Sequence, residues 1–255
     1  MRADVYLAKQ GYARGRTEAK ELIGSGLVFC DGKPVSKPAQ EIDPDLPHTV
    51  SVSETGEERF VSRGGKKLAH ALSVFGVSPE GRVALDIGAS SGGFTDCLLR
   101  RGAAHVYALD CGSGQLVPEL RRDARVTVME NYNARRLDPH DFSPPPDLLT
   151  MDVSFISQTL IFPAIAALLS AGGELISLVK PQFEVGREGI GKGGIVRDAA
   201  LRRAALERVE ASAASLGFML LGETESPIPG GDGNIEYLAH FRIPAGRRGE
   251  EYERK

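Results

Sequence analysis

The segment from Val83 to Phe241 alternates short apolar runs with helix-like runs, and this alternation constrains the fold more than any other feature of the sequence. Parallel strands need a crossover connection, usually a helix, so repeated alternation favours βαβ units. The sequence therefore predicts an α/β fold with a doubly wound, mostly parallel sheet. The expected strands are Val83–Ile87, His105–Leu109, Val126–Met129, Leu148–Asp152, Glu174–Val179, Phe218–Leu221 and Glu236–Phe241. The expected helices lie near Gly93–Arg101, Leu116–Arg121, Gln158–Leu169 and Ala199–Leu216.

Composition and local polarity predict how the chain divides into domains. Of the 255 residues, 42% are hydrophobic, which is enough for a substantial core. The stretch Ser53–Arg59 is polar and lacks apolar periodicity, as is typical of a linker, and the charged end of the chain is typical of a mobile tail. We expect a small domain over residues 1–60, a larger domain over 61–243 and a charged tail over 244–255.

The first forty residues predict a small α+β domain with a basic surface. A helix is expected over Arg16–Ile23, followed by strands at Leu27–Cys30 and Lys33–Val35 joined by a hairpin turn. A further strand is expected at Thr49–Val52. Residues 1–40 hold seven basic and four acidic side chains, although the whole chain has a net charge of -3. The pattern resembles the S4 RNA-binding domain, and the alternative is an ordinary solvated basic face. The candidate RNA-binding residues are Arg2, Arg14, Arg16, Lys20 and Lys37.

The glycine-rich segment Asp86–Phe94 joins an expected strand to an expected helix, where backbone can approach a ligand closely. Asp110 ends the next strand, where a carboxylate can accept hydrogen bonds from ribose hydroxyls. The charge of Asp86 would repel a pyrophosphate but attract the cationic amino group of S-adenosylmethionine (SAM). We therefore expect SAM as the cofactor; the alternative is a turn that binds nothing. The candidate cofactor-binding residues are Asp86, Gly88, Ser90, Gly92, Gly93, Phe94 and Asp110.

Four ionisable residues are expected near the same sheet edge. Asp152 and Lys180 each end a strand, and Glu236 starts the last one. Helical spacing in the segment after Ser62 places Lys67 on one stripe with Ala71 and Val74, and Lys66 on a polar stripe with His70 and Ser73. We therefore expect Lys67 to face inward and Lys66 to face water. Taken singly, each of these charges is more often a surface group than a catalytic one.

Together the motifs SRGGKKL, DIGASSGGF, DVSFIS, LVKPQFE and GNIEYL resemble those of the heat-shock ribosomal-RNA 2'-O-methyltransferase superfamily. The S4-like domain ahead of them narrows the resemblance to the hemolysin-A-like (TlyA) rRNA methyltransferases. The resemblance implies a SAM-binding Rossmann-like domain with a catalytic tetrad at Lys67, Asp152, Lys180 and Glu236. It also implies a substrate, the cytidine ribose of rRNA in ribosomal subunits. The segment Glu130–Asn133 departs from the superfamily pattern, and we take Asn131 from it as a further candidate cofactor residue.

The chemistry of the implied reaction gives the tetrad a rationale. A ribose 2'-hydroxyl is a poor nucleophile, so the enzyme must align it with the methyl group and help its proton to leave. We expect Lys180 at the ribose oxygen, either as a neutral base or as a stabilising cation. Asp152 would orient Lys180 and the SAM amine, while Lys67 and Glu236 position the ribose. The following glycine-rich loop, with Arg187 and Lys192, is either a lid on the target nucleotide or a plain connection.

Other classes of function fit the sequence less well. The three cysteines lack C-x-x-C spacing, so neither a disulfide framework nor a metal site is expected. No apolar run is long enough to span a membrane and no secretory signal is seen, so we expect a cytoplasmic protein. The runner-up is a non-enzymatic, SAM-sensing ribosome-binding factor, which an intact tetrad argues against. A membrane-lysing protein and a nicotinamide-dependent oxidoreductase are also disfavoured, and the sequence does not indicate an oligomeric state.

Overall fold

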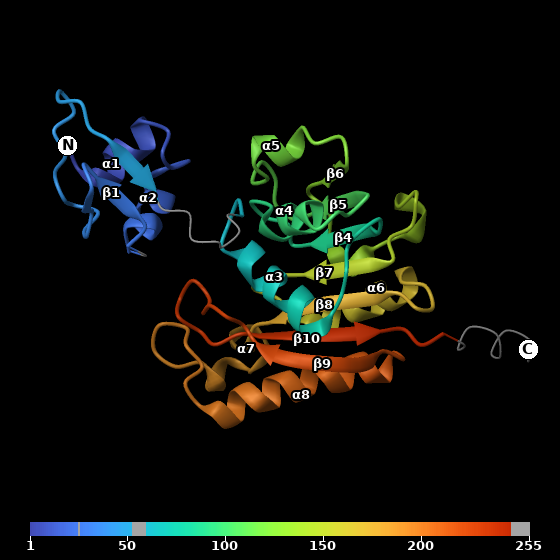
Figure 1. The fold of residues 1–255 in the computed structure, drawn as a ribbon. Coiled ribbons are helices and arrows are strands. Elements are labelled where there is room, and N and C mark those ends of the chain that lie inside the picture. The colour runs from blue at the N-terminus through green and yellow to red at the C-terminus, as the bar shows by residue number, and fades with distance from the viewer. Residues whose placement is uncertain (25, 53–59, 246–255) are drawn as a thin grey trace, which may run out of the picture. The chain divides into compact units, whose positions relative to one another are not determined.

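The computed structural model describes residues 1–24, 26–52 and 60–245 and divides into two compact units, Met1–Arg59 and Phe60–Lys255 (Figure 1). The linker expected at Ser53–Arg59 lies outside the described residues. The same holds for residues 246–255 of the expected tail. Each unit has its own hydrophobic core, so we describe the two separately.

The first unit packs two helices against a three-stranded antiparallel sheet. Its strands lie in the order β2-β1-β3. Helix α2 buries Ala19, Leu22 and Ile23 on one face, as its spacing predicts. The sequence pattern did not indicate α1, whose short amphipathic run has few repeats. The elements are α1 (Ala3–Lys9), α2 (Arg16–Gly24), β1 (Val28–Cys30), β2 (Lys33–Pro34) and β3 (Val50–Val52).

The second unit is built on a seven-stranded sheet in the order β6-β5-β4-β7-β8-β10-β9. The five strands from β6 to β8 are parallel, and β10 runs antiparallel to both of its neighbours. The expected doubly wound, mostly parallel sheet is therefore confirmed. Its strands are β4 (Val83–Ile87), β5 (His105–Leu109), β6 (Val126–Met129), β7 (Leu148–Met151), β8 (Glu174–Val179), β9 (Met219–Glu225) and β10 (Tyr237–Arg242).

Helices cover both faces of this sheet because its central strands are apolar on both sides. One hydrophobic cluster joins α3, α4 and α5 to one face, and another joins α6 and α8 to the other (Figure 1). The helices are α3 (Gly64–Phe75), α4 (Gly93–Arg100), α5 (Pro118–Arg121), α6 (Phe162–Leu168), α7 (Pro181–Glu184) and α8 (Ala199–Ser215). Single 3₁₀ turns are η1 (Ala134–Arg136), η2 (Pro139–Asp141), η3 (Gln158–Leu160) and η4 (Arg187–Gly189).

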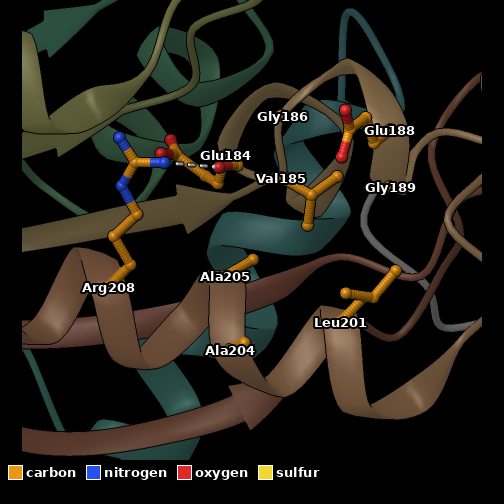
Figure 2. Close-up of a pocket in the computed structure, with 9 residues that line it drawn as sticks. All are labelled: Glu184, Val185, Gly186, Glu188, Gly189, Leu201, Ala204, Ala205 and Arg208. Atoms are coloured by element: carbon orange, nitrogen blue, oxygen red, sulfur yellow. Dashed lines mark hydrogen bonds between the residues drawn. The ribbon is translucent and has the colours of Figure 1, made fainter.

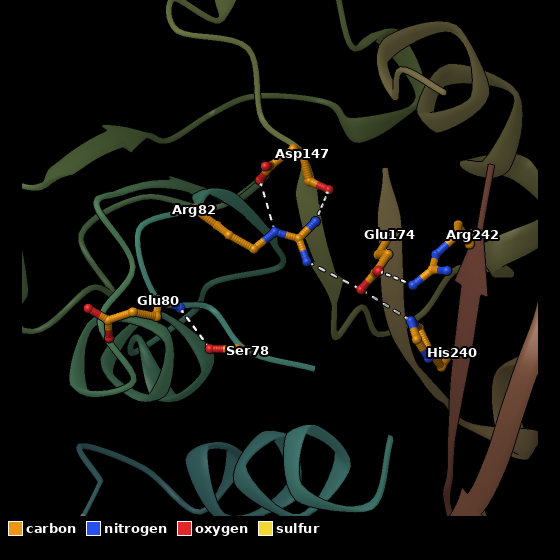
Figure 3. Close-up of polar contacts among 7 residues, drawn as sticks. All are labelled: Ser78, Glu80, Arg82, Asp147, Glu174, His240 and Arg242. Atoms are coloured by element: carbon orange, nitrogen blue, oxygen red, sulfur yellow. Dashed lines mark hydrogen bonds and ion pairs between the residues drawn. The ribbon is translucent and has the colours of Figure 1, made fainter. Parts of the chain in front are cut away.

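A buried carboxylate holds the strands together at the edge of the sheet where the parallel strands begin. Glu174 lies between Arg82 on one side and Arg242 and His240 on the other (Figure 3). Arg82 also donates to the Asp147 carboxylate, at 3.2 Å. Burial by itself would raise the pKa of Glu174, but the two guanidinium groups lower it below its usual value. This network stabilises the edge opposite to the one where the candidate site lies.

Candidate active site

The four residues of the expected tetrad come from four elements that meet at one edge of the sheet. Asp152 and Lys180 directly follow β7 and β8, so both lie at the carboxyl ends of parallel strands. Because β10 is antiparallel to β8, with Tyr237 paired to Val179, Glu236 lies at the same edge as Lys180. Lys67 reaches the edge from the first half of α3. Ligand sites of open α/β sheets are found at this edge.

The tetrad forms two ion pairs. The Lys67 ammonium donates to Glu236, and both side chains are buried. The Lys180 Nζ atom lies 2.5 Å from an Asp152 carboxylate oxygen and donates to the Ser154 hydroxyl at 3.0 Å. Two cations are thus matched by two anions, which lowers the cost of placing four charges in a partly desolvated site.

The inward position of Lys67 is confirmed, but the stripe expected to carry it is partly wrong. Helix α3 buries Gly65, Lys67, Leu68, Ala71 and Leu72, and Lys66 is exposed as expected. Val74, expected on the inner stripe, is 51% exposed. The inner face is centred on Leu68 and Leu72, which the helical spacing alone did not locate.

The glycine-rich turn after β4 takes a conformation that fits close ligand approach. Gly88 and Gly92 have φ angles of +87° and +99°, and Ser90 has +48°. A Cβ atom on Gly88 would clash with the backbone carbonyl of Asp152, and one on Gly92 would clash with leucine side chains next to α4. The turn therefore needs glycine for both backbone conformation and space.

Asp110 fixes this turn to the neighbouring loop. Its two carboxylate oxygens accept hydrogen bonds from the backbone N–H groups of Ser90 and Gly112, each at 2.8 Å. The backbone N–H of Asn131 donates to the Gly112 carbonyl at 3.0 Å, and Asn131 is exposed with a φ of +57°. Asp110 and Asn131 therefore both lie beside the glycine turn, while carboxylate lone pairs remain for a ribose hydroxyl.

The structure places Asp86 within β4, directly before the glycine turn. Its carboxylate is completely buried and accepts hydrogen bonds from the hydroxyls of Thr95 at 2.7 Å and Thr150 at 3.1 Å. Burial raises the pKa of Asp86 to about 7. The other residues of β4 are apolar, and each carboxylate oxygen of Asp86 has one threonine partner.

Phe94 and Gly93, two further candidate cofactor residues, pack against neighbouring elements of the domain. Phe94 belongs to the buried cluster that joins α3 and α4 to the sheet. A Cβ atom on Gly93 would clash with the Ser62 side chain. Both residues therefore fix the start of α4 against the start of α3. The glycine-rich pattern did not distinguish residues that line a turn from those that pack its far side.

Glu130, in the segment that departs from the superfamily pattern, is held by protein groups. Its carboxylate forms an ion pair with Arg121 and accepts a hydrogen bond from the Gly114 N–H at 2.8 Å. The hydrogen bond from Arg121 is the main cause that lowers the pKa of Glu130. This arrangement joins α5 to the end of β6.

Phe155 is a candidate residue that the sequence analysis missed. Its side chain is 92% exposed, its φ is +63°, and its ring centroid lies 5.2 Å from that of Phe183. A bulky residue with positive φ is a genuine outlier and often marks a functional position. Phe155 directly follows Ser154, the hydroxyl that contacts Lys180. The only sequence signal was its place in the DVSFIS motif.

The loop after α7 is tied to the loop that leads into β10. The Asn234 side chain is buried, accepts from the Val196 N–H and donates to the Gly194 carbonyl, both at 2.9 Å. Lys192 lies in this loop and is exposed. Arg187 begins the 3₁₀ turn η4.

In the first unit, the candidate RNA-binding residues fall into two groups. Arg14, Lys20 and Lys37 are exposed. Arg2 and Arg16 are exposed too, but they also donate to the buried carboxylate of Asp4, at 3.0 and 3.1 Å. The hydrogen bond from Arg2 is the main cause that lowers the pKa of Asp4 to about 2. Arg2 and Arg16 therefore stabilise the fold as well as presenting charge.

One mixed cluster of side chains in the first unit has the residue types of a metal site. Cys30, Asp31 and His48 lie together, but His48 already uses both ring nitrogens. Its Nδ1 lies 2.7 Å from Asp31, and its Nε2 lies 2.9 Å from the Asp43 carbonyl. The cluster is accounted for as a hydrogen-bonded link between the hairpin turn and the loop before β3.

Among the described residues, no helix is long and apolar enough to cross a membrane.

Comparison with known proteins gives matches over nearly the whole chain. The FtsJ-like methyltransferase family matches residues 60–243, and the S4 domain matches residues 1–46. The chain is 45% identical to the 16S/23S rRNA (cytidine-2'-O)-methyltransferase TlyA of Mycobacterium tuberculosis, over 96% of this chain and 91% of that protein. It is 44% identical to Hemolysin A of Brachyspira hyodysenteriae, over 95% of this chain and 100% of that protein.

A solved structure agrees with these matches. A candidate hemolysin from Streptococcus thermophilus aligns with a TM-score of 0.75 and 46% identity, over 96% of this chain and 89% of that one. The methyltransferase match covers the sheet and all four tetrad positions, and the second match covers most of the first unit, including its basic first forty residues. The chain therefore belongs to the FtsJ-like methyltransferase family and carries an N-terminal S4 domain.

Proposed function

We propose that this protein transfers a methyl group from SAM to a ribose 2'-hydroxyl of ribosomal RNA, with cytidine as the target nucleoside. The observation that carries the proposal is the pairing of Lys67 with Glu236 and of Lys180 with Asp152 at the edge that also holds the glycine turn. The similarity to TlyA of Mycobacterium tuberculosis supports the choice of cytidine and of rRNA. The intact ion pairs favour this function over a non-enzymatic SAM sensor.

The residues around the glycine turn fit SAM as the cofactor. The positive φ angles of Gly88 and Gly92 and their packing against Asp152 and Leu120 fix a tight turn between β4 and α4, the junction where open α/β sheets bind ligands. Asp110 directly follows β5 beside this turn and is placed to accept hydrogen bonds from ribose hydroxyls. Asn131 borders the same loop. Asp86 acts indirectly in this proposal, because its carboxylate bonds to Thr95 and Thr150 beneath the turn.

The chain's own residues would align the nucleophile and accommodate its proton. SAM supplies an electrophilic methyl group, whose bond to sulfur breaks as a bond to the ribose oxygen forms. Lys180 lies at the ribose oxygen in our proposal, oriented by Asp152 and Ser154. The Lys67–Glu236 pair forms the wall that positions the ribose. Lys180 either takes the hydroxyl proton or stabilises the negative charge on oxygen.

The remaining exposed groups would bind the RNA around the target. The ring of Phe155 presents an apolar face next to Ser154, and stacking on an aromatic ring is a common way to hold an unpaired base. The S4 domain would supply phosphate contacts through Arg14, Lys20 and Lys37.

The test is methyl transfer from labelled SAM to isolated ribosomal subunits and to whole ribosomes, followed by mapping of the modified ribose. Wild-type protein should label a cytidine 2'-hydroxyl, and Lys180→Ala should lower the single-turnover rate by about 10²-fold or more while SAM affinity stays the same. The guanidinium of a Lys180→Arg variant stays protonated and cannot act as a base, so residual activity in that variant favours stabilisation of the negative charge on oxygen over base catalysis. A Lys180→Ala enzyme that keeps more than about a tenth of the rate would remove Lys180 from the mechanism.

A further inference from the structure

Glu184 is almost completely buried, at 3% exposure, although it ends the single-turn helix α7 only four residues after Lys180. Its carboxylate accepts hydrogen bonds from the Ser157 hydroxyl at 2.6 Å and from the Gln158 backbone N–H at 2.9 Å. Burial raises the pKa of Glu184. Burying a carboxyl group costs free energy unless it is hydrogen-bonded, so the hydrogen bonds from Ser157 and Gln158 compensate for this cost and hold the Glu184 side chain in place.

Both partners of Glu184 belong to the segment 152–158, which also contains two contacts of Lys180. Asp152 and Ser154 lie at the start of this segment, and Ser157 and Gln158 lie at its end. The Gln158 side chain adds two further bonds to β8, donating to the Leu178 carbonyl and accepting from the Ser177 hydroxyl, each at 2.6 Å. The segment is therefore fastened to the β8–α7 region at both ends.

Helix α7 is held in turn by a hydrogen bond from α8. Arg208 of α8 donates to the backbone carbonyl of Glu184 at 3.0 Å, and the two residues lie side by side in Figure 2. They line one end of a pocket of about 520 Å³, and Leu201 and Glu188 lie at its other end. Glu184 thus connects α8 to the segment that orients the catalytic lysine.

We propose that Glu184 is a positioning residue for methyl transfer, which holds segment 152–158 so that Asp152 and Ser154 meet Lys180 in the reactive arrangement. The inference rests on the proposed function and deepens it. Glu184 itself does not touch substrate in this proposal. Displacement of a catalytic group by about 1 Å can lower a rate by about 10²-fold, so loss of this link should affect the chemical step.

The test compares single-turnover methyl transfer to ribosomal subunits at saturating SAM and RNA. Glu184→Ala should lower the rate by about 10²-fold and lower SAM affinity much less, because the hydrogen bonds from Ser90 and Gly112 to Asp110 do not involve segment 152–158. Glu184→Gln, in contrast, should keep the rate within a few-fold of wild type. Its amide oxygen can accept from the Gln158 N–H, and the Ser157 hydroxyl, which also bonds to Thr159, can turn to accept from the amide nitrogen.

Glu188→Ala is the matched control, since Glu188 is an exposed glutamate at the rim of the same pocket. Equal rates in Glu184→Ala and Glu188→Ala would overturn the inference. So would a Glu184→Ala protein that melts at a lower temperature but keeps the wild-type rate while folded. If Glu184→Ala does not fold, Ser157→Ala decides: a loss of about tenfold supports the inference and an unchanged rate overturns it. Absence of transfer by wild-type protein would instead overturn the proposed function.

Discussion

Lys67 and Glu236 are 169 residues apart in the sequence, yet their side chains form an ion pair that leaves only 9% and 3% of them exposed. Removing one member of a buried ion pair leaves an uncompensated charge and typically costs about 3–5 kcal/mol. The pair therefore joins the first helix of the methyltransferase domain to its last strand, and it places two ionisable groups at the candidate site.

Substitution of adjacent lysines tests the assignment of faces on α3. Lys67→Ala should lose most methyl transfer and lower stability, because Glu236 stays buried without its partner. Lys66→Ala should keep activity within a few-fold, because Lys66 is exposed. Single-turnover rates and urea unfolding measure the two effects. Equal losses in both variants would contradict the inward position of Lys67.

Asp86→Asn should change how stability depends on pH. Because the pKa of Asp86 is raised to about 7 in the folded protein, the folded state holds this proton more tightly than the unfolded state. The stability that the protonated group contributes is present at low pH and is lost as pH rises from about 4 to about 7. The variant lacks this titration, so its unfolding free energy should rise relative to that of wild type by a few kcal/mol over that range. Urea unfolding at several pH values from 4.5 to 8 measures both free energies, and a difference between them that stays constant with pH would rule the prediction out.

Asp110→Ala should weaken SAM binding by about tenfold or more, because a lost charged hydrogen bond costs about 1.5–3 kcal/mol. It also frees the Ser90 and Gly112 N–H groups that shape the turn. Asp86→Asn should weaken SAM binding much less, since its carboxylate lies beneath the turn. Calorimetry with SAM measures both. An equal loss in the two variants would show that Asp86 acts as directly as Asp110.

Phe155→Ala should lower methyl transfer without lowering SAM affinity or stability, because the exposed ring packs only against Phe183 among the ring contacts that the structure describes. Stacking of a base on an aromatic ring is worth about 1–3 kcal/mol, so kcat/KM for rRNA should fall about 5- to 150-fold. Phe155→Trp should retain most activity. A Phe155→Ala enzyme with the wild-type kcat/KM for rRNA would exclude the ring from substrate binding.

A Lys20→Ala, Lys37→Ala double variant should weaken rRNA binding and reduce the slope of log affinity against log salt by about 1.5, because each lysine would neutralise one phosphate. Its stability should match wild type, since both side chains are exposed. Asp4→Asn is the contrasting variant, because Arg2 and Arg16 lose a charged partner and the first unit should lose stability. Filter binding at several salt concentrations, with thermal melts, separates the two effects. An unchanged salt slope would remove both lysines from the RNA surface.

Hydrophobic periodicity predicted the elements of the large domain well, because the central strands are continuous apolar runs between turns. It was weaker at the edge of the sheet. The apolar run Phe218–Leu221 marked only the start of β9, which continues to Glu225 through hydrogen bonds with β10. Polar residues on an edge strand give no apolar signal.

Three tetrad positions, Asp152, Lys180 and Glu236, are charges next to apolar runs, and Lys67 was placed by helical spacing; the resemblance to the 2'-O-methyltransferase superfamily grouped the four. The expected role of Asp152 in orienting Lys180 agrees with their ion pair, whereas the direct pairing of Lys67 with Glu236 depends on how α3 packs on the sheet and was not indicated. The two threonine partners of Asp86 gave no sequence signal, because a carboxylate within a buried strand has the same sequence pattern whatever hydroxyl groups lie next to it. Glu184 stands at the end of the LVKPQFE motif, and its burial could not be predicted because its two partners lie about 26 residues earlier in the chain.

The place of Glu236 at the start of the last strand has a consequence for the order in which the protein is made. Synthesis proceeds from the N-terminus, and domains emerge and fold in that order. The S4 domain and the first six strands of the second unit are therefore synthesised before the segment that carries Glu236. Until that segment emerges, Lys67 lacks its carboxylate partner, so the ion pair that joins α3 to β10 is among the last contacts of the domain to form.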